Sequence, residues 1–141
     1  MNKELVKSLN SLIKSVNRKI NLECVILFGS QARNEAMPQS DIDLIFIGDF
    51  EKKFTRRSKI IYNNFNFDLG RGLDAFCYTA SEFDRMFYEG VVSILDSIDE
   101  GICLLGEEFF EKYKKILNKL KERGLKKDPP VWILPESMEV N

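Results

Sequence analysis

The sequence predicts a β-sheet of the α/β or α+β class, covered by helices, within a single domain. Short apolar runs typical of strands, at residues 22–28, 42–47 and 73–78, alternate with segments whose apolar residues recur at helical spacing. A chain of 141 residues can bury a core without a metal or a disulfide. The three cysteines are odd in number and lie among apolar neighbours, so we expect reduced thiols in the core.

In the first half of the chain, helices are expected before, between and after the first two strands. Residues 3–20 should form an amphipathic helix, because their apolar residues are spaced three or four apart: Leu5, Leu9, Leu12, Ile13, Val16 and Ile20. A short helix should begin after Ser30 and end near Pro38, since proline cannot continue it. Residues 52–65 mix basic and apolar side chains and are predicted to form another helix.

The second half is predicted to be mainly helical. Thr79 and Glu82 have the spacing of a capping box, which starts a helix that should run to about Tyr88. Gly90 separates this helix from the next one, over residues 91–99. A short strand or extended turn at residues 101–105 and a helix at residues 107–122 should follow.

The end of the chain differs in composition from the rest. Its prolines forbid a helix, yet it carries the only tryptophan. We therefore divide the chain into a domain at residues 1–125 and a proline-containing C-terminal tail at residues 126–141. The tail either covers an apolar patch of its own domain or docks on a second subunit or a partner. Docking on a second subunit would make the protein a homo-oligomer, and this possibility stays open.

Composition excludes several classes of function. Basic and acidic residues number 21 and 22, so there is no concentrated positive field, and direct nucleic-acid binding is not expected. No histidine is present, which excludes histidine-based acid–base catalysis and histidine-ligated metals within the chain. No apolar run approaches the ~18 residues of a membrane span, and the first residues lack an apolar signal segment, so we expect a cytoplasmic protein.

Two neighbouring motifs indicate the chemistry: GSQAR at residues 29–33 follows one strand, and SDIDL at residues 40–44 opens the next. Side chains two apart on a strand share a face, so Asp41 and Asp43 should project together. Like charges this close repel each other unless a cation neutralises them, and oxygen ligands favour Mg²⁺. The Gly-Ser turn before a helix suits a phosphate. Together the motifs predict metal-dependent chemistry on a nucleoside triphosphate.

The combined pattern resembles the signature of the DNA polymerase beta-like nucleotidyltransferase superfamily, in particular its small prokaryotic branch, the minimal nucleotidyltransferases (MNT). That family carries a third carboxylate on a later strand; Asp74 matches it here, with Asp68 as its rival. The resemblance implies a small mixed β-sheet flanked by helices. The active site should lie where the first two strands meet the Gly-Ser helix.

The resemblance also implies roles for individual residues. The catalytic carboxylates, which would hold two Mg²⁺ ions, are Asp41, Asp43 and Asp74. The phosphates of the substrate ATP would be bound by Gly29, Ser30, Arg33 and Ser40. Structural roles stay open for three of these: Ser30 as a helix N-cap, Arg33 in a surface salt bridge, and Ser40 as the start of a strand.

Many small family members similar to this one are antitoxins, paired with an all-helical HEPN ribonuclease toxin. The resemblance implies transfer of AMP from ATP to a tyrosine of that toxin. The chain lacks the Arg-x4-6-His motif of HEPN proteins, so it would be the transferase of the pair. The alternatives are a non-catalytic antitoxin that acts by binding, and a small-molecule nucleotidyltransferase of the aminoglycoside-modifying type, which usually has a larger substrate-binding domain.

Two runs of basic side chains, at residues 52–59 and 114–127, are expected to be solvated faces. Contact with a triphosphate or with an acidic partner is the other interpretation.

Overall fold

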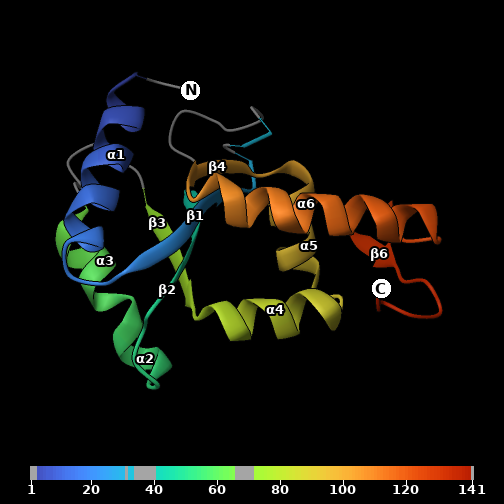
Figure 1. Cartoon of the computed structure of the whole chain (residues 1–141). Helices are drawn as coiled ribbons and strands as arrows, with labels where there is room; N and C mark the ends of the chain where they lie inside the picture. The colour runs from blue at the N-terminus through green and yellow to red at the C-terminus, as the bar shows by residue number, and fades with distance from the viewer. Residues whose placement is uncertain (1–2, 31, 34–40, 66–71, 141) are drawn as a thin grey trace.

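The computed structural model describes residues 3–30, 32–33, 41–65 and 72–140, and structural statements concern this part of the chain. Its main sheet has four strands in the order β3-β2-β1-β4. They are β1 (Leu22–Phe28), β2 (Ile42–Gly48), β3 (Leu73–Tyr78) and β4 (Ile102–Leu105). The central pair β1–β2 is antiparallel, as is β1–β4, whereas β2 and β3 are parallel. The predicted small mixed sheet is therefore confirmed (Figure 1).

Helices cover both faces of this sheet (Figure 1). On one face lie α1 (Lys3–Asn17) and α3 (Lys59–Asn64), and α2 (Phe54–Arg57) comes just before α3, near the edge strand β3. On the other lie α4 (Ala80–Tyr88), α5 (Val92–Glu100) and α6 (Glu107–Glu122). The predicted capping box is present at the start of α4, where the Thr79 side chain accepts from the Glu82 N–H and the Glu82 side chain accepts from the Thr79 N–H. No described helix is both long and apolar enough to cross a membrane.

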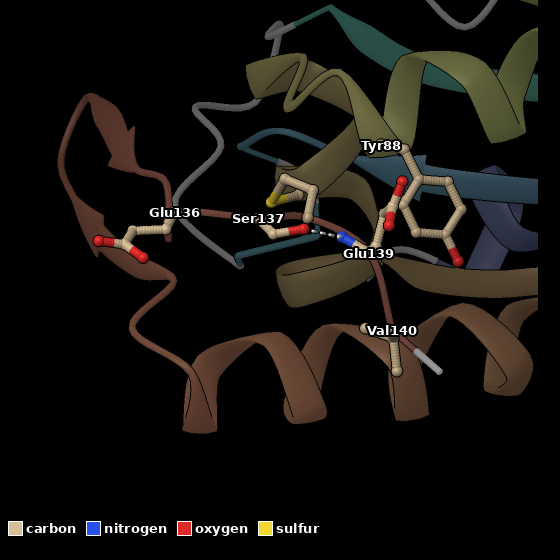
Figure 2. Close-up of a pocket in the computed structure, with 6 residues that line it drawn as sticks. Tyr88, Glu136, Ser137, Glu139 and Val140 are labelled. Carbon is tan, nitrogen blue, oxygen red and sulfur yellow. Dashed lines mark hydrogen bonds between the residues drawn. The ribbon is translucent and has the colours of Figure 1, made fainter.

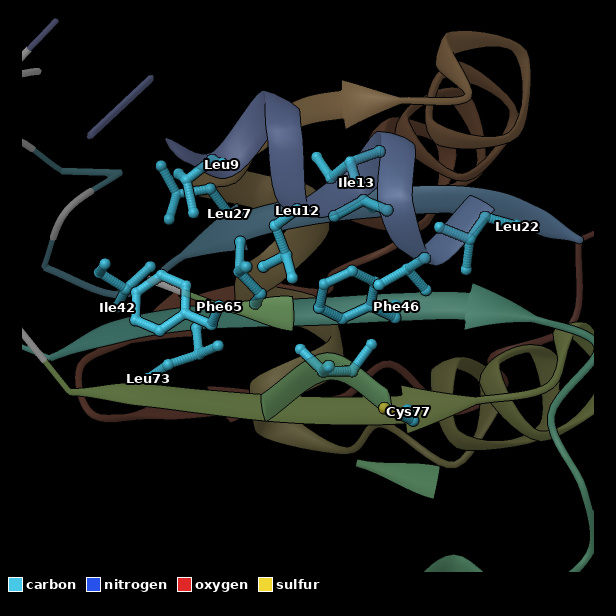
Figure 3. Close-up of a cluster of buried hydrophobic side chains, with 14 of the residues drawn as sticks. Leu9, Leu12, Ile13, Leu22, Leu27, Ile42, Phe46, Phe65, Leu73 and Cys77 are labelled. Carbon is cyan, nitrogen blue, oxygen red and sulfur yellow. The ribbon is translucent and has the colours of Figure 1, made fainter. Parts of the chain in front are cut away.

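Each face of the sheet has its own core, because side chains alternate along the strands. Beneath α1 and α3, Leu27 and Phe46 pack with Leu9 and Leu12 of α1 (Figure 3). On the opposite face, Ile26 packs in a cluster with side chains of the other three helices, namely Phe83, Phe87, Ile94, Ile98, Phe109, Tyr113 and Leu117.

Of the two helices predicted between β1 and β3, only the second lies wholly within the described residues. The single helix expected over residues 52–65 is wrong, because the segment divides into α2 and α3 at Ser58. The helix expected between Ser30 and Pro38 falls mostly outside the described residues.

The expected solvated basic face at residues 52–59 is wrong for Arg57, whose side chain is 3% exposed. Its guanidinium donates to both carboxylate oxygens of Glu82, at 2.6 and 3.2 Å. It also donates to the backbone oxygens of Glu51 and Cys77. These four hydrogen bonds satisfy the buried charge, so Arg57 connects α2 with the end of β3 and the start of α4.

The tail is packed on its own domain. It forms a two-stranded hairpin from β5 (Lys126–Asp128) and β6 (Val131–Ile133). Trp132 is buried, and its indole N–H donates to Asp96 of α5 at 2.9 Å. The residues that follow run beside α4, where they and Tyr88 line a cavity of about 670 Å³ (Figure 2).

Replacing Glu82 by Gln should destabilise the protein by roughly 3 kcal/mol, because Arg57 would keep a buried charge without its carboxylate partner. The matched control is Glu89→Gln, which removes an exposed ion pair with Arg85 on the same helix and should cost under about 1 kcal/mol. Chemical denaturation at pH 7 measures both changes. Equal losses in the two variants would contradict the role given to Arg57.

The same contact makes stability depend on pH. Burial alone would raise the pKa of Glu82, but its hydrogen bonds with Arg57 and Thr79 outweigh burial and lower it below the ordinary value of 4.5. A carboxyl group with a lowered pKa stabilises the fold above its unfolded pKa, and that contribution disappears as the pH falls through the folded pKa. The stability gap between the wild type and Glu82→Gln should therefore narrow below about pH 4.5 in denaturation series at several pH values. A constant gap would contradict this coupling.

Candidate functional site

Strand register brings two of the candidate carboxylates side by side. In the sheet, Asp43 of β2 lies between Phe28 of β1 and Asp74 of β3, its direct partners on either side. Asp41 precedes Asp43 by two residues and therefore projects to the same side. All three carboxylates thus gather where β1 ends and β2 and β3 begin.

The electrostatics of Asp43 show how close these groups are. Its half-buried carboxyl has a raised pKa, first because of burial, then because of the charge of Asp74 and a hydrogen bond with it, and then because of the charge of Asp41. The positive charge of Arg33 acts in the opposite direction. Asp43 is therefore the centre of an excess of negative charge that a cation would neutralise.

Two glycines leave room for these carboxylates. Gly29 has a φ of +74°, and a Cβ at this position would collide with the Oδ2 of Asp43. A Cβ at Gly72 would collide with the Oδ1 of Asp41. The sequence predicts that Gly29 lets a phosphate approach the backbone closely, and it predicts no role for Gly72. The only signal for Gly72 was its place just before the strand that carries Asp74.

The chain turns tightly after β1, at the predicted phosphate-binding segment. The Arg33 N–H donates to the Gly29 carbonyl oxygen at 3.2 Å, so Arg33 lies one turn beyond Gly29 and Ser30. Its guanidinium donates to the Oε2 of Glu100, at the end of α5, at 3.4 Å. Glu100 was not predicted, because 67 residues separate it from Arg33 and no local pattern links them.

Aromatic side chains border the carboxylates on the same face of the sheet. The rings of Phe28 and Phe76 meet edge to face, with centroids 5.8 Å apart. Phe28 is the cross-strand partner of Asp43, and Phe76 follows Asp74 by two residues. The site therefore has an apolar wall beside its charged groups.

The donor set suits a hard divalent cation, since carboxylate oxygens are the ligands that Mg²⁺ prefers. Asp43 and Asp74 are direct cross-strand partners with Asp41 close by, and this arrangement fits such an ion. Within the described ranges, no three acidic or cysteine side chains already converge closely enough to ligate one ion together. Ser40 and Asp68 lie outside the described residues, so Ser40 is not placed and Asp74 is the candidate that the sheet positions.

Without metal, Asp43→Asn should raise the melting temperature at pH 7 by about 2–4 °C, the equivalent of about 1 kcal/mol for a domain of this size. Asp43 has a raised pKa, so its protonated form is favoured in the folded state. Its contribution to stability is present below the unfolded pKa and is lost as the pH rises through the folded pKa. At pH 7 the charged carboxylate of Asp43 therefore destabilises the fold, and Asn removes that charge. Added Mg²⁺ should stabilise the wild type but not the variant. Thermal unfolding in EDTA and in Mg²⁺ tests both points.

The control for this measurement is Asp49→Asn, at an exposed aspartate beyond the other end of β2. It should leave the Mg²⁺ response unchanged. An equal response to Mg²⁺ in Asp43→Asn would contradict the placement of a cation at this carboxylate.

Gly72→Ala should weaken the Mg²⁺ response severalfold and change metal-free stability little, because its Cβ would displace only the Asp41 side chain. Gly124→Ala should lower metal-free stability by about 1 kcal/mol and leave the Mg²⁺ response unchanged. The φ of Gly124 is +112°, which is strained for any other residue. A Cβ there would meet no close neighbour, since the nearest atom is 4.0 Å away in Pro135. Melting temperatures with and without Mg²⁺ separate the two effects. A normal Mg²⁺ response in Gly72→Ala would contradict the role of Asp41.

Comparison with solved structures supports the fold. A protein from Sulfolobus solfataricus assigned as a nucleotidyltransferase superposes with a TM-score of 0.54 at 21% identity, over 74% of this chain and 83% of that one. A toxin–antitoxin structure with AMP-PNP gives a TM-score of 0.54 at 19% identity, over 80% of this chain and 89% of the other. A variant of the toxin–antitoxin MntA-HpeT gives 0.52 at 18%, over 80% and 88%.

A search of functionally curated proteins finds no significant match. The family model described as "Polymerase beta, Nucleotidyltransferase" matches residues 10–90, more than half of the chain. That range contains both sequence motifs, all three candidate carboxylates and the strands β1, β2 and β3. This chain belongs to the polymerase beta nucleotidyltransferase family.

Proposed function

We propose that this protein transfers AMP from ATP to a hydroxyl group in a Mg²⁺-dependent reaction. The observation that carries the proposal is the direct cross-strand pairing of Asp43 with Asp74, with Asp41 two residues before Asp43, next to the turn that carries Arg33. Carboxylates in this arrangement are expected to bind a metal and to repel each other without one. Membership of the nucleotidyltransferase family supports the same chemistry.

Asp41, Asp43 and Asp74 would hold two Mg²⁺ ions, which when bound stabilise charge on the attacking and leaving oxygens of the displacement. Asp74, on the strand farthest from the Gly-Ser turn, would accept the proton of the acceptor hydroxyl. The hydroxyl oxygen then forms a bond to the α-phosphorus, and the bond from that phosphorus to the bridging oxygen breaks. Pyrophosphate leaves, and AMP stays on the acceptor.

The leaving phosphates would be held on the β1 side of Asp43. Backbone N–H groups at Gly29 and Ser30 suit phosphate oxygens, and glycine lets them approach closely. Arg33 adds a positive charge one turn later. Ser40, next to Asp41 in the sequence, is proposed as a further phosphate contact.

The acceptor is proposed to be a tyrosine of a HEPN ribonuclease toxin, which would make this protein the antitoxin of a cytoplasmic two-gene module. Among its structural neighbours are a toxin–antitoxin with AMP-PNP and a variant of MntA-HpeT with two aspartates replaced by glutamates. Those aspartates have the same spacing as Asp41 and Asp43.

The double variant Asp41→Ala/Asp43→Ala should lose transfer completely, because two of the three proposed metal ligands are gone. The test incubates the product of the adjacent gene with this protein, ATP and Mg²⁺, and measures the intact mass of that product. Addition of one or more AMP groups by the wild type is the expected result. The control Asp49→Ala should transfer as the wild type does.

Retained transfer in the double variant would refute the assignment of these carboxylates. A stable complex of the two proteins without any gain in mass would instead favour an antitoxin that acts by binding alone.

A further inference from the structure

Ion pairs connect Arg33 to the C-terminal hairpin through a single carboxylate. Glu100 accepts from Arg33 with its Oε2, at 3.4 Å, and from the ammonium of Lys127 with its Oε1, at 2.7 Å. Lys127 lies on β5, so the tail supplies this second cation. Glu100 is thus shared between a candidate phosphate-binding residue and the hairpin, and its contact with the hairpin is the shorter one.

The hairpin holds Lys127 firmly in this position. The Lys127 ammonium also pairs with the Oδ1 of Asp96 at 2.9 Å, and the same oxygen accepts from the indole N–H of Trp132 at 2.9 Å. Burial alone would lower the pKa of Lys127, but its bonds with Glu100 and Asp96 outweigh burial and raise it. Lys127 therefore stays charged and offsets the negative charge of α5 at this point.

The ion pair between Arg33 and Glu100 is not enclosed by packed side chains. A cavity of about 380 Å³ lies between the turn, α5 and the hairpin, and it is lined by Arg33, Asp96, Glu100, Lys127, Pro129 and Pro130. The charge of Arg33 also acts on Asp43, which places it within electrostatic reach of the carboxylate site. Arg33 therefore lies between two sources of negative charge, Glu100 and the carboxylate site.

We propose that Lys127 is a positioning residue for nucleotide binding: by neutralising Glu100, it weakens the hold of Glu100 on Arg33 and leaves Arg33 available for the phosphates of ATP. This inference rests on the proposed function, in which Arg33 binds phosphate. It assigns the tail a role in the site, although none of its side chains has to touch the nucleotide. Without Lys127, Glu100 would compete for Arg33 with its full charge.

The test is the affinity of the full chain for ATP with Mg²⁺, measured by calorimetry without an acceptor protein, so that binding is observed without transfer. Lys127→Gln should weaken binding roughly two- to fivefold, the effect of one strengthened exposed ion pair. Lys127→Arg should bind like the wild type. Glu100→Gln should bind as tightly as the wild type or more tightly, because it removes the negative charge that competes with phosphate for Arg33.

Lys121→Gln is a matched control. The ammonium of Lys121 also pairs with a carboxylate of α5, Asp99, at 2.6 Å, and it also lies over the Trp132 ring, but it does not contact Glu100. The Lys121→Gln variant should lose about as much thermal stability as Lys127→Gln, without any change in its affinity for ATP. A purely structural role of Lys127 would make the two variants behave alike.

The double variant Lys127→Gln/Glu100→Gln decides the mechanism. Restored affinity supports the proposal, because removing Glu100 removes the competitor for Arg33. Affinity that stays low means that Lys127 acts on the nucleotide directly, which overturns the proposal. Unchanged binding in Lys127→Gln also overturns it.

Arg33→Gln separates this inference from the proposed function. A wild type that binds no ATP would refute the proposed function itself. Binding that is the same in the wild type and Arg33→Gln would remove Arg33 from phosphate binding and overturn the inference. If Arg33→Gln weakens binding but Lys127→Gln does not, only the role of Lys127 fails.

Discussion

The register of β2 between its two neighbours is the constraint on which the site depends. It places Asp43 directly between Phe28 and Asp74, and it sends Asp43 and Ile45 to the same face of the sheet. A slip of one residue would turn Asp43 toward α1 and expose apolar side chains that are now buried on both faces. The two cores therefore enforce the register, and the register forces like charges together.

Several features let the fold tolerate this concentration of charge. Gly29 and Gly72 leave space where a side chain would collide with a carboxylate, and Arg33 supplies a nearby positive charge. The raised pKa of Asp43 shows that the compensation is incomplete. Stability from the cores on both sides of the sheet holds the carboxylates in an arrangement that they would not adopt alone, and this is the arrangement proposed to bind a cation.

Two arginines differ in burial, and only the more exposed one is proposed to bind phosphate. Arg57 is almost fully buried, donates to both oxygens of Glu82 and has no freedom to bind anything else. Arg33 is 37% exposed, makes a longer contact with Glu100 and adjoins a cavity. An exposed ion pair of this kind is weak enough for a phosphate to replace, whereas the buried pair is not.

Local sequence patterns determined most of the secondary structure and the candidate carboxylates. The strands at residues 22–28 and 73–78 and the helix at residues 107–122 were predicted with the bounds that the structure has, because apolar spacing and breaking residues act over a few positions. The spacing of Asp41 and Asp43 likewise identified a shared face. The family resemblance added Asp74, and the structure pairs it with Asp43.

Only the tertiary structure decided which distant residues meet. The strand order, the buried position of Arg57, the space at Gly72 and the link from Arg33 through Glu100 to Lys127 all depend on segments far apart in the chain. The spacing of side chains over residues 52–65 likewise gave no sign of the division into α2 and α3 at Ser58. Apolar spacing shows which face of an element is buried, but the partner of a buried or shared charge is chosen when the sheet and helices assemble.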